Sequence, residues 1–530
     1  MKPTEETARS RIKTKRSATS LLLLIIITGL ALRCVHYTQM KANNPIFDLP
    51  IVDAKEYVNN ADYYLHKNFW GPPGAYFHPP LYSYSVAAVF AIFGHSLDAV
   101  RIVQILLDTL SILLLFLIAR RIFGSTVGLI AAGFYALYIP IIQYTTELLP
   151  PVLAVFLLLV SSYALLRFLD TDTRTRAAPA WLVLAGLSYG MLVTNLVNFI
   201  LPVLFVLPWL TRALKDQSAR VRIKWVAAFT LLVLLPPLTA SARNYFKAKE
   251  PVFVSYNGGI NFYIGNNTRM DRTVGLRPGF EYDRLVMIPY EQAEITNFTD
   301  QSKFWSGRVW QFIRTRPIDW LLILVKKTIL FFNAYEFPRN FDSAYFARYS
   351  FLHRLPLFRL NFILPLSLAA IVLVLLRRDK IIKRLPVLFL VGILFSYSLS
   401  IILFHVAGRY RLPIVPIFCI LAAWFVREFA ASIRSRSRHR ILRLGSYAGL
   451  FVLFLVATRI RYFSGSYPYA IEPSETLSQI GQALTEVRQY ERARVFFEQG
   501  LTRPTDRSTY MLYYYYASLE YLTGDTTRAV

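Results

Sequence analysis

Apolar runs long enough to cross a lipid bilayer recur along the chain, and they restrict its fold more than any other feature. A helix needs about 20 apolar residues to span the hydrocarbon core of a membrane. Hydrophobic residues make up 55% of the chain and its mean hydropathy is +0.39, well above that of a soluble protein. The sequence therefore predicts a polytopic α-helical membrane protein.

The net charge of +27 is spread over short basic clusters that lie between the apolar runs. Loops on the cytoplasmic side of a membrane carry such an excess of lysine and arginine. No basic face with base-stacking aromatic residues accompanies the charge, which argues against a nucleic-acid partner. Cys34 and Cys419 both lie in apolar segments and predict neither a disulfide framework nor a thiolate metal site.

The basic clusters also order the spans. A basic cytoplasmic N-terminus (residues 1–19) precedes a first anchor that lacks the small-residue cleavage motif of a signal peptide. We expect about eleven spans, which leave the C-terminus on the extracytoplasmic side of the inner (cytoplasmic) membrane. The expected spans are residues 21–37, 99–119, 127–144, 148–168, 181–193, 195–210, 225–240, 360–376, 385–404, 412–429 and 446–458.

Two further apolar pieces are expected not to cross the membrane. Residues 82–93 are too few to do so, and residues 320–332 carry Lys326 and Lys327 in their middle. We expect the first piece to lie at the membrane surface. The second is expected to be horizontal or re-entrant, with both lysines reaching the outer surface.

The membrane domain is expected to cover residues 20–460, with large outer loops at residues 38–98 and 243–317. In the second loop, Gly258-Gly259 and Asn266-Asn267 predict tight turns with positive φ. The Val, Phe, Tyr and Ile residues that alternate nearby predict short strands.

The tail, residues 471–530, resembles a pair of tetratricopeptide repeats with a period of about 34 residues. Small or apolar residues stand where such helix pairs need them: Gly481, Leu484, Ala493, Phe497 and Gly500, then Ala517, Gly524 and Ala529. Two units rarely suffice alone, so we expect the start of a longer array or a cap on the membrane domain. Such a tail could bind a protein partner.

The first outer loop and the next one hold the candidate acids. Asp53 could act as a general base toward an acceptor hydroxyl or amine, or it could cap the start of a helix. Glu147 could be a second acid, or a first-turn carboxylate of the span that follows it. His78 begins a His-Pro-Pro-Leu-Tyr run that ends at Tyr82, and it could contact a ligand or simply belong to a rigid turn.

Arginines at the outer ends of spans are the candidate phosphate ligands. The run Arg409-Tyr410-Arg411 begins one span and Arg243 ends another at the same surface. Guanidinium forks match phosphate groups, although the same side chains could merely reach lipid headgroups. Lysine and arginine are usually enriched on the cytoplasmic side of a membrane protein. Because these arginines lie on the outer side instead, phosphate binding is the favoured interpretation.

Several of these features recur as motifs in one order along the chain. They are HPPLY after an Asp-bearing outer loop, then ARRIFG, TTELL, SARNYF, NGGINFYIGNN and GRYRLPIVP. This order resembles the bacterial branch of the membrane GT-C glycosyltransferases of family 39, akin to protein O-mannosyltransferases and aminoarabinose transferases. The resemblance covers roughly residues 20–460.

The resemblance implies a polyprenyl-phosphate-linked sugar as donor, transferred outside the cytoplasmic membrane with inversion. It implies Asp53 as the catalytic aspartate, Glu147 as the acid of the second outer loop, and Arg243, Arg409 and Arg411 around the donor phosphate. The mannosyltransferases carry an adjacent Asp-Glu pair, whereas Ala54 follows Asp53 here. The acceptor class, the sugar and any need for a divalent metal therefore stay open.

Two other functions compete with a glycosyltransferase. A transporter or lipid flippase would also be polytopic, but it should show acids or broken helices at mid-span and an internal repeat. The expected spans hold almost no ionisable residues and no repeat of the two halves is visible. The other competitor is a membrane scaffold that works through its repeats.

Overall fold

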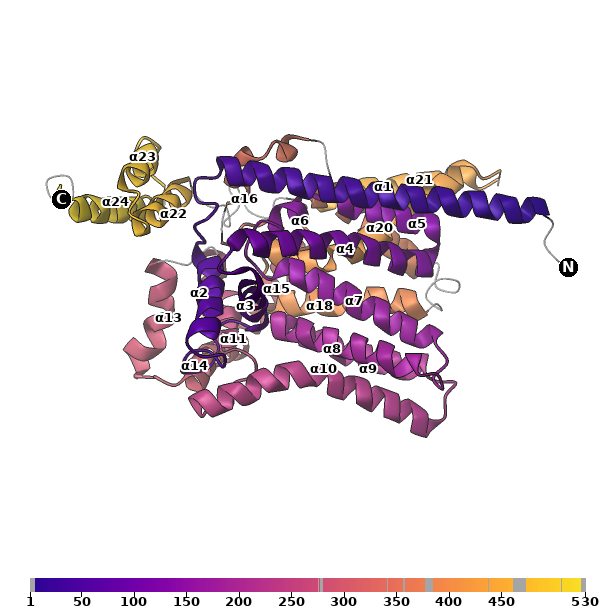
Figure 1. The fold of residues 1–530 in the computed structure, drawn as a ribbon, viewed down its shortest axis with the longest axis horizontal. Helices are drawn as coiled ribbons and strands as arrows, with labels where there is room; N and C mark the ends of the chain where they lie inside the picture. Colours follow the sequence, from indigo (N-terminus) through magenta and orange to yellow (C-terminus); the bar gives the residue numbers. More distant parts are fainter. Residues whose placement is uncertain are drawn as a thin grey trace.

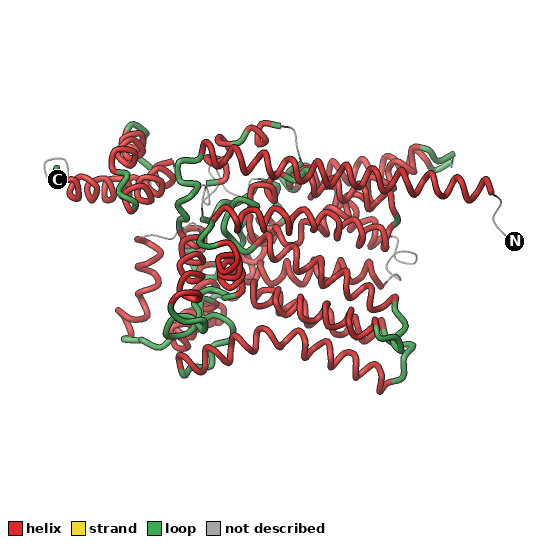
Figure 2. Tube along the Cα trace, in the orientation of Figure 1, coloured by secondary structure: helices red, strands yellow, loops and turns green. Residues whose placement is uncertain are grey.

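The computed structural model describes residues 5–274, 276, 280–340, 342–355, 358–376, 385–436, 438–460, 473–506 and 508–525. Within these ranges the regular elements are helices, with no strand (Figure 2). Among the described residues, eight helices are long and apolar enough to cross a membrane. The predicted polytopic α-helical fold is therefore confirmed.

The long helices lie side by side as a bundle (Figure 1). Their bounds are α1 (Glu5–Asn43), α4 (Leu97–Phe123), α5 (Ser125–Ala136), α7 (Pro151–Asp170), α8 (Ala177–Asn195), α9 (Ile200–Ala213), α10 (Ala219–Ala248), α17 (Leu360–Leu376), α18 (Leu385–Leu403), α20 (Val415–Ile433) and α21 (Arg440–Ala457). Three of them, α5, α9 and α17, are shorter than the eight long spans, so the count of about eleven crossings stays a prediction.

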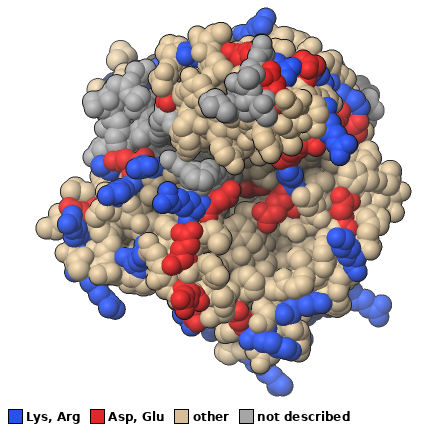
Figure 3. Space-filling model, turned by 90° about the vertical axis from the view of Figure 1, so that its left-hand side faces the viewer, with Lys and Arg blue, Asp and Glu red and all other residues tan. Residues whose placement is uncertain are grey.

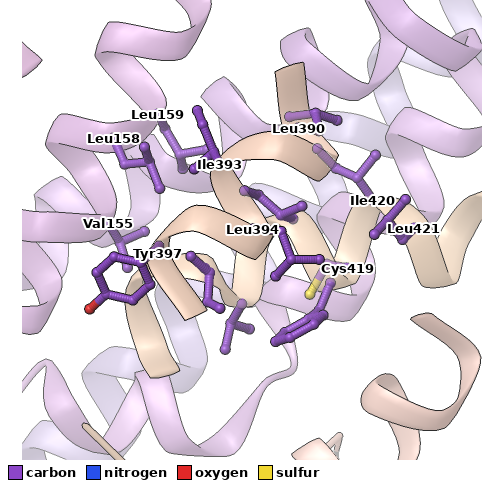
Figure 4. Close-up of a cluster of buried hydrophobic side chains, with 14 of the residues drawn as sticks. Val155, Leu158, Leu159, Leu390, Ile393, Leu394, Tyr397, Cys419, Ile420 and Leu421 are labelled. Carbon is purple, nitrogen blue, oxygen red and sulfur yellow. The ribbon is translucent and has the colours of Figure 1, made fainter. Parts of the chain in front are cut away.

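Apolar side chains fill the interior of this bundle. Figure 4 shows α18 between α7 and α20, with Val155, Ile393 and Leu421 among the buried contacts. Other apolar side chains, such as Leu204 and Leu231, are about 70% exposed on the outside of the bundle. An apolar interior and an apolar exterior together are typical of a helix bundle that sits in lipid.

Shorter helices gather at one end of the bundle, here termed the α2 end. Figure 1 shows α2 (Val52–His66) upright against the bundle and α3 (Leu81–Phe93) almost end-on. The other short helices are α6 (Ile139–Tyr144), α11 (Gly258–Ile264), α12 (Met270–Thr273), α13 (Phe280–Ala293), α14 (Phe298–Thr315), α15 (Pro317–Phe331), α16 (Ser343–Phe346) and α19 (Gly408–Arg411). Four 3-10 turns are η1 (Val197–Phe199), η2 (Ala347–Tyr349), η3 (Phe351–Arg354) and η4 (Leu412–Ile414).

One expected span is broken. Residues 127–144 form α5 and α6, and the chain between them pairs with a distant segment through an isolated bridge from Tyr138 to Phe358. Pro140 in the first turn of α6 has no backbone N–H to continue the preceding helix.

The strands expected in residues 243–317 are wrong, because this segment folds into α11 to α14. The expected turn at Asn266-Asn267 is present but has no positive φ, whereas Gly258-Gly259 begin α11 and form no turn. In this segment φ is positive at Lys249, Val254 and Glu294. Gly259 is needed for space, since a Cβ there would lie 2.1 Å from the carbonyl oxygen of Ser302. An apolar alternation cannot reveal such a close helix contact.

The expected outer placement of Lys327 is also wrong. Its side chain is buried, and its ammonium group donates to Asn266 Oδ1 at 2.9 Å and to the Phe404 carbonyl at 3.0 Å. Lys327 thus binds a backbone carbonyl at the end of α18, where a positive charge is favoured. Lys326 is partly exposed and pairs with Asp271 at 3.4 Å.

The tail contains α22 (Pro473–Glu486), α23 (Tyr490–Leu501) and α24 (Thr509–Thr523). Close packing uses two of the predicted small residues. A Cβ at Gly481 would lie 2.5 Å from the Phe497 ring, and one at Gly500 would lie 2.5 Å from Leu512. The assignment as tetratricopeptide repeats stays a prediction, and Ala529 lies outside the described residues.

Candidate active site

A cavity of about 920 Å³ opens at the α2 end. Its walls come from α2, the loop before α3, α13, η1, α9, the end of α18, α19 and the tail. Figure 3 views this end of the molecule and shows a hollowed face with acidic side chains gathered around it. The segments that form the cavity are far apart in the sequence.

Asp53 and Arg409 meet inside this cavity. Arg409 Nη1 donates to Asp53 Oδ2 at 2.9 Å, and both side chains are 12% exposed. Asp53 is the second residue of α2, and no side chain caps the start of that helix. Val52, just before it, has φ of 54°, which is strained for a β-branched residue and typical of functional sites.

The surroundings keep Asp53 ionised. Burial raises the pKa of its carboxyl, but the charges of Arg409 and His78 outweigh burial and lower the pKa well below its ordinary value. Asp53 is therefore an acceptor of hydrogen bonds at neutral pH, although Arg409 weakens it as a base.

His78 belongs to the same cavity. Its Nε2 lies 3.0 Å from Glu56 Oε2, and its ring packs against Tyr57 with the centroids 5.4 Å apart. Burial lowers the pKa of His78, but the hydrogen bond to Glu56 and the charges of Glu56 and Asp53 raise it above its ordinary value. One face of α2 thus places Asp53, Glu56 and Tyr57 around the imidazole.

Arg409 keeps donor capacity beyond its ion pair. Its Nη2 donates to the Tyr410 hydroxyl at 3.1 Å, whereas its buried Nε has no hydrogen-bond partner among the described residues. Tyr410 also lines the cavity and packs edge-on against His405. A buried guanidinium with an unused donor is suited to an incoming anion.

The other two candidate arginines bind mainly backbone carbonyls, although the buried Nε of Arg411 has no hydrogen-bond partner among the described residues. Arg411 is 1% exposed and binds the carbonyls of Asn333 at 2.6 Å and Phe331 at 3.3 Å, as well as Glu336 at 2.8 Å. Arg243 donates to three carbonyls in residues 70–74 and stacks over the Tyr76 ring. Neither lines the cavity, so neither enters our proposed donor site.

Glu147 and Tyr82 also lie outside the large cavity. Tyr82 donates to Gln104 Oε1 at 2.8 Å, and Glu147 lines a separate cavity of about 50 Å³ with Arg101. Asn340 lines both cavities and so marks where they adjoin. Burial raises the pKa of Glu147 to about 7 against the opposing charge of Arg101.

Residues 77–239 match the family described as dolichyl-phosphate-mannose-protein mannosyltransferase. This segment is a domain of that family. The match confirms the resemblance predicted from the motifs, and it includes His78, Tyr82 and Glu147. Asp53 and Arg409 lie outside it, so their roles rest on the cavity alone.

Solved structures with a similar arrangement of helices include two from Archaeoglobus fulgidus and one from Cupriavidus metallidurans. The first is the oligosaccharyltransferase in its apo form, with 13% identity over 90% of this chain and a TM-score of 0.47. The same enzyme, AglB, with an inhibitory peptide and dolichol phosphate has 13% identity, 90% coverage and a TM-score of 0.44. This chain spans 59% of the length of each.

The third is ArnT bound to undecaprenyl phosphate, with 14% identity over 89% of each chain and a TM-score of 0.36. A search of curated proteins finds no significant match.

Several lining residues were missed from the sequence. They are Asn340, His405, Asp283, Gln479 and Tyr515. His405 stands four residues before Arg409, so its place near the GRYRLP motif was the available signal. Among the described residues, no three His, Cys, Asp or Glu side chains are grouped to hold a metal ion.

Proposed function

We propose that this chain is a membrane glycosyltransferase that moves a sugar from a polyprenyl-phosphate donor to an acceptor at the α2 end of the bundle. The observation that carries the proposal is the cavity with its Asp53–Arg409 pair. It offers an ionised carboxylate and an incompletely paired guanidinium within 2.9 Å of each other. The family domain in residues 77–239 supports the same chemistry.

The bundle side of the cavity suits the lipid part of the donor. Its lining there is apolar: Leu196, Val197, Ile200, Leu201, Ile401 and Leu403. The opposite side is polar and carries Asp53, Glu56 and His78. A polyprenyl chain would therefore lie along η1, α9 and α18, with its phosphate toward Arg409.

In this proposal Arg409 pairs with two anions, the Asp53 carboxylate and the phosphate of the donor. When the donor phosphate binds, Arg409 pairs with it and its contact with Asp53 weakens. The pKa of Asp53 then rises, because its nearest positive charge is shared, and the carboxylate becomes a better base. Asp53 would thus become active when the donor is in place.

The reaction is a single displacement. The acceptor oxygen forms a bond to the anomeric carbon while the bond from that carbon to the phosphate oxygen breaks. The acceptor proton goes to Asp53, and the electron pair of the broken bond goes to the phosphate, which Arg409 stabilises. Configuration at the anomeric carbon is inverted.

Purified chain in proteoliposomes would test the proposal with a set of polyprenyl-phosphate-linked hexoses and pentoses. We expect one of them to be consumed, with release of polyprenyl phosphate measured by mass spectrometry. A chain that only translocates lipid would move the donor between leaflets without cleaving it. A scaffold would do neither.

We further propose that the α2 end faces the extracytoplasmic side of the inner membrane, with the N-terminus in the cytoplasm. The basic N-terminus and the loops at the other end of the bundle support this orientation. A cysteine introduced at Ser255 should then react with a membrane-impermeant thiol reagent in intact cells, and one at Ser435 should not. The reverse labelling would contradict the orientation.

A further inference from the structure

The tail forms part of the cavity wall. Four residues of α22 share one helix face and line the cavity: Gln479, Gln482, Ala483 and Glu486. Helix α24 adds Met511 and Tyr515, whereas no residue of α23 lines the cavity. The tail therefore contributes to the site itself.

Gln479 is the most informative residue of this wall. It is 7% exposed, and neither its amide nitrogen nor its amide oxygen has a hydrogen-bond partner in the part of the chain that the structure describes. Buried amides are almost always paired in folded proteins. An unpaired amide that lines a cavity therefore indicates a ligand that can both donate and accept a hydrogen bond.

A row of tyrosines leads from the outer surface of α24 to the cavity. Tyr514 is 63% exposed and Tyr521 is 70% exposed, and they lie on one helix face, two turns apart. The Tyr514 ring contacts the Tyr515 ring, with the centroids 5.3 Å apart, and Tyr515 lines the cavity.

Tyrosines also gather where a protein meets the surface of a membrane, but that explanation does not fit this row. Figure 1 shows α24 reaching away from the bundle, beyond the α2 end. The exposed rings of Tyr514 and Tyr521 therefore lie away from the apolar flank of the bundle, and they are available to a ligand in water.

The positive charges of the cavity lie on its α18–α19 side. Arg339 and Arg409 both line the cavity, and after burial their charges lower the pKa of His405, so these side chains are close together. Arg409 pairs with Asp53, and Arg339 donates to two backbone carbonyls at 2.8 and 3.0 Å. This is the side that the proposed function assigns to the donor phosphate.

The charges beside the tail are mainly acidic. Asp283 and Glu486 lie close to Tyr515, since after burial their charges raise the pKa of its hydroxyl. Lys55, the one lysine in the lining, pairs with Glu486 at 2.6 Å, whereas Asp283 has no ion pair among the described residues. A ligand beside the tail would meet repulsion if it carried carboxylates or phosphates, and a neutral ligand would not.

We propose that α22 and α24 form the acceptor-binding wall of the transferase, and that the acceptor is a neutral glycan. The inference rests on the proposed function. The C–H face of a sugar ring packs on an aromatic ring, so Tyr515, Tyr514 and Tyr521 would bind separate sugar units along the glycan. A sugar hydroxyl both donates and accepts, which complements the two unpaired atoms of Gln479.

The same wall is less suited to a polypeptide. Peptides that bind to helical surfaces place aliphatic anchors in an apolar groove. Here the exposed row consists of tyrosines, and the cavity wall next to it carries the amides of Gln479 and Gln482. Amphipathic rings beside amides match a hydroxyl-rich ligand better than an aliphatic one.

The experiment uses the full chain in nanodiscs and four fluorescently labelled probes. They are neutral hexasaccharides of glucose and of N-acetylglucosamine, an acidic hexasaccharide of galacturonic acid, and a neutral serine-containing decapeptide. Fluorescence anisotropy reports binding without any donor. We expect a neutral hexasaccharide to bind more tightly than the other two classes of probe.

Two substitutions test the wall. Gln479→Ala should weaken glycan binding about three- to tenfold, the effect of losing one or two neutral hydrogen bonds. Tyr514→Ala should weaken it about two- to tenfold through the lost ring contact, and it keeps the test decisive if Gln479→Ala fails to fold, because Tyr514 is exposed. With a polyprenyl-phosphate-linked hexose as donor, each should raise the KM for the glycan by the same factor.

The matched controls are Gln499→Ala on α23 and Tyr290→Ala on α13, since both residues are exposed and neither lines the cavity. Both should bind glycan as wild type does. The inference is overturned if neither neutral hexasaccharide binds, if the acidic one binds as tightly, if Gln479→Ala and Tyr514→Ala change nothing, or if the decapeptide binds through Gln479 instead. Glycan binding that depends on Gln479 and Tyr514, without any donor cleavage, would support the wall and count against the proposed function alone.

Discussion

Two buried ion pairs in this molecule are alike in chemistry and differ in their surroundings. Asp53–Arg409 lies in the cavity at the α2 end, and each side chain is 12% exposed. Arg33–Asp108 joins α1 to α4 inside the bundle, and both side chains are fully buried. The second pair lines neither of the two cavities described above.

The inner pair is surrounded by further hydrogen bonds. Arg33 Nη1 donates to the carbonyls of Gly29 at 2.8 Å and Ala136 at 3.1 Å, while Asp108 accepts from the Tyr135 hydroxyl. It therefore joins three helices. Asp53–Arg409 faces open space instead, so it can exchange one partner for a substrate. The spans were expected to hold almost no ionisable residues, yet this pair lies inside two of them. Charges at mid-span can mark a transport path, but this pair lines neither of the two cavities described above.

The largest expected effect is on transfer by Asp53→Asn. Removing the base should lower kcat about 10²- to 10⁴-fold, while the protein still folds and binds donor. Asp62→Asn is the control, since Asp62 lies on the same helix and pairs with His95 outside the cavity. Asp53→Asn activity within about tenfold of wild type would refute the general-base role.

Asp108→Asn should affect stability instead. Leaving Arg33 unpaired inside the bundle should cost about 3–5 kcal/mol, seen as a lower unfolding midpoint in detergent. The fraction that stays folded should keep its kcat. If Asp108→Asn abolished transfer at unchanged stability, the two pairs would not divide their roles as we describe.

Arg409→Gln should reduce kcat/KM about 30- to 150-fold, which corresponds to the roughly 2–3 kcal/mol of a charge-assisted contact with phosphate. The mutant should also lose its preference for phosphorylated lipid in competition assays. Arg348→Gln is a control at an exposed arginine of the same end. Arg411→Gln should destabilise the fold instead, because Arg411 holds backbone carbonyls. A full phosphate preference in Arg409→Gln would make Arg409 a structural residue too.

The smallest expected effect is the pH dependence caused by Glu147. Its pKa of about 7 exceeds its ordinary value of 4.5, so between these values the folded chain binds more protons than the unfolded chain. The free energy of unfolding should therefore fall as pH rises from about 5 to 7, by roughly 1–2 kcal/mol. Glu147→Gln should flatten this slope when unfolding midpoints are compared at pH 5, 6, 7 and 8. An unchanged slope would contradict the assigned cause.

Most helices of the bundle could be predicted from the sequence, because a membrane span is recognised from the length of its own apolar run and from the basic residues beside it. The site followed only in part. Asp53 and Arg409 are 356 positions apart, and only the motif order suggested that both serve one reaction. The sequence could not show that Arg243 and Arg411 bind backbone carbonyls outside the cavity, because a guanidinium group fits a cluster of carbonyls as well as a phosphate. Lys327 was misplaced for the same reason, since its carbonyl partners come from a distant helix end.

The contribution of the tail was also beyond sequence reasoning. Gln479 is an ordinary polar residue in an amphipathic helix, and its importance comes from lying against the cavity. The tail was expected to be an array or a cap, which describes how it folds and not what it lines. Contacts between separate segments decide such roles.

A structure of the chain with bound polyprenyl phosphate tests the central claim most directly. We expect the phosphate within about 3 Å of the Arg409 guanidinium, with the lipid chain along η1, α9 and α18 and a lengthened contact between Arg409 and Asp53. Phosphate bound elsewhere, with the Asp53–Arg409 pair intact and the cavity empty of lipid, would contradict the claim that this cavity is where the donor is cleaved.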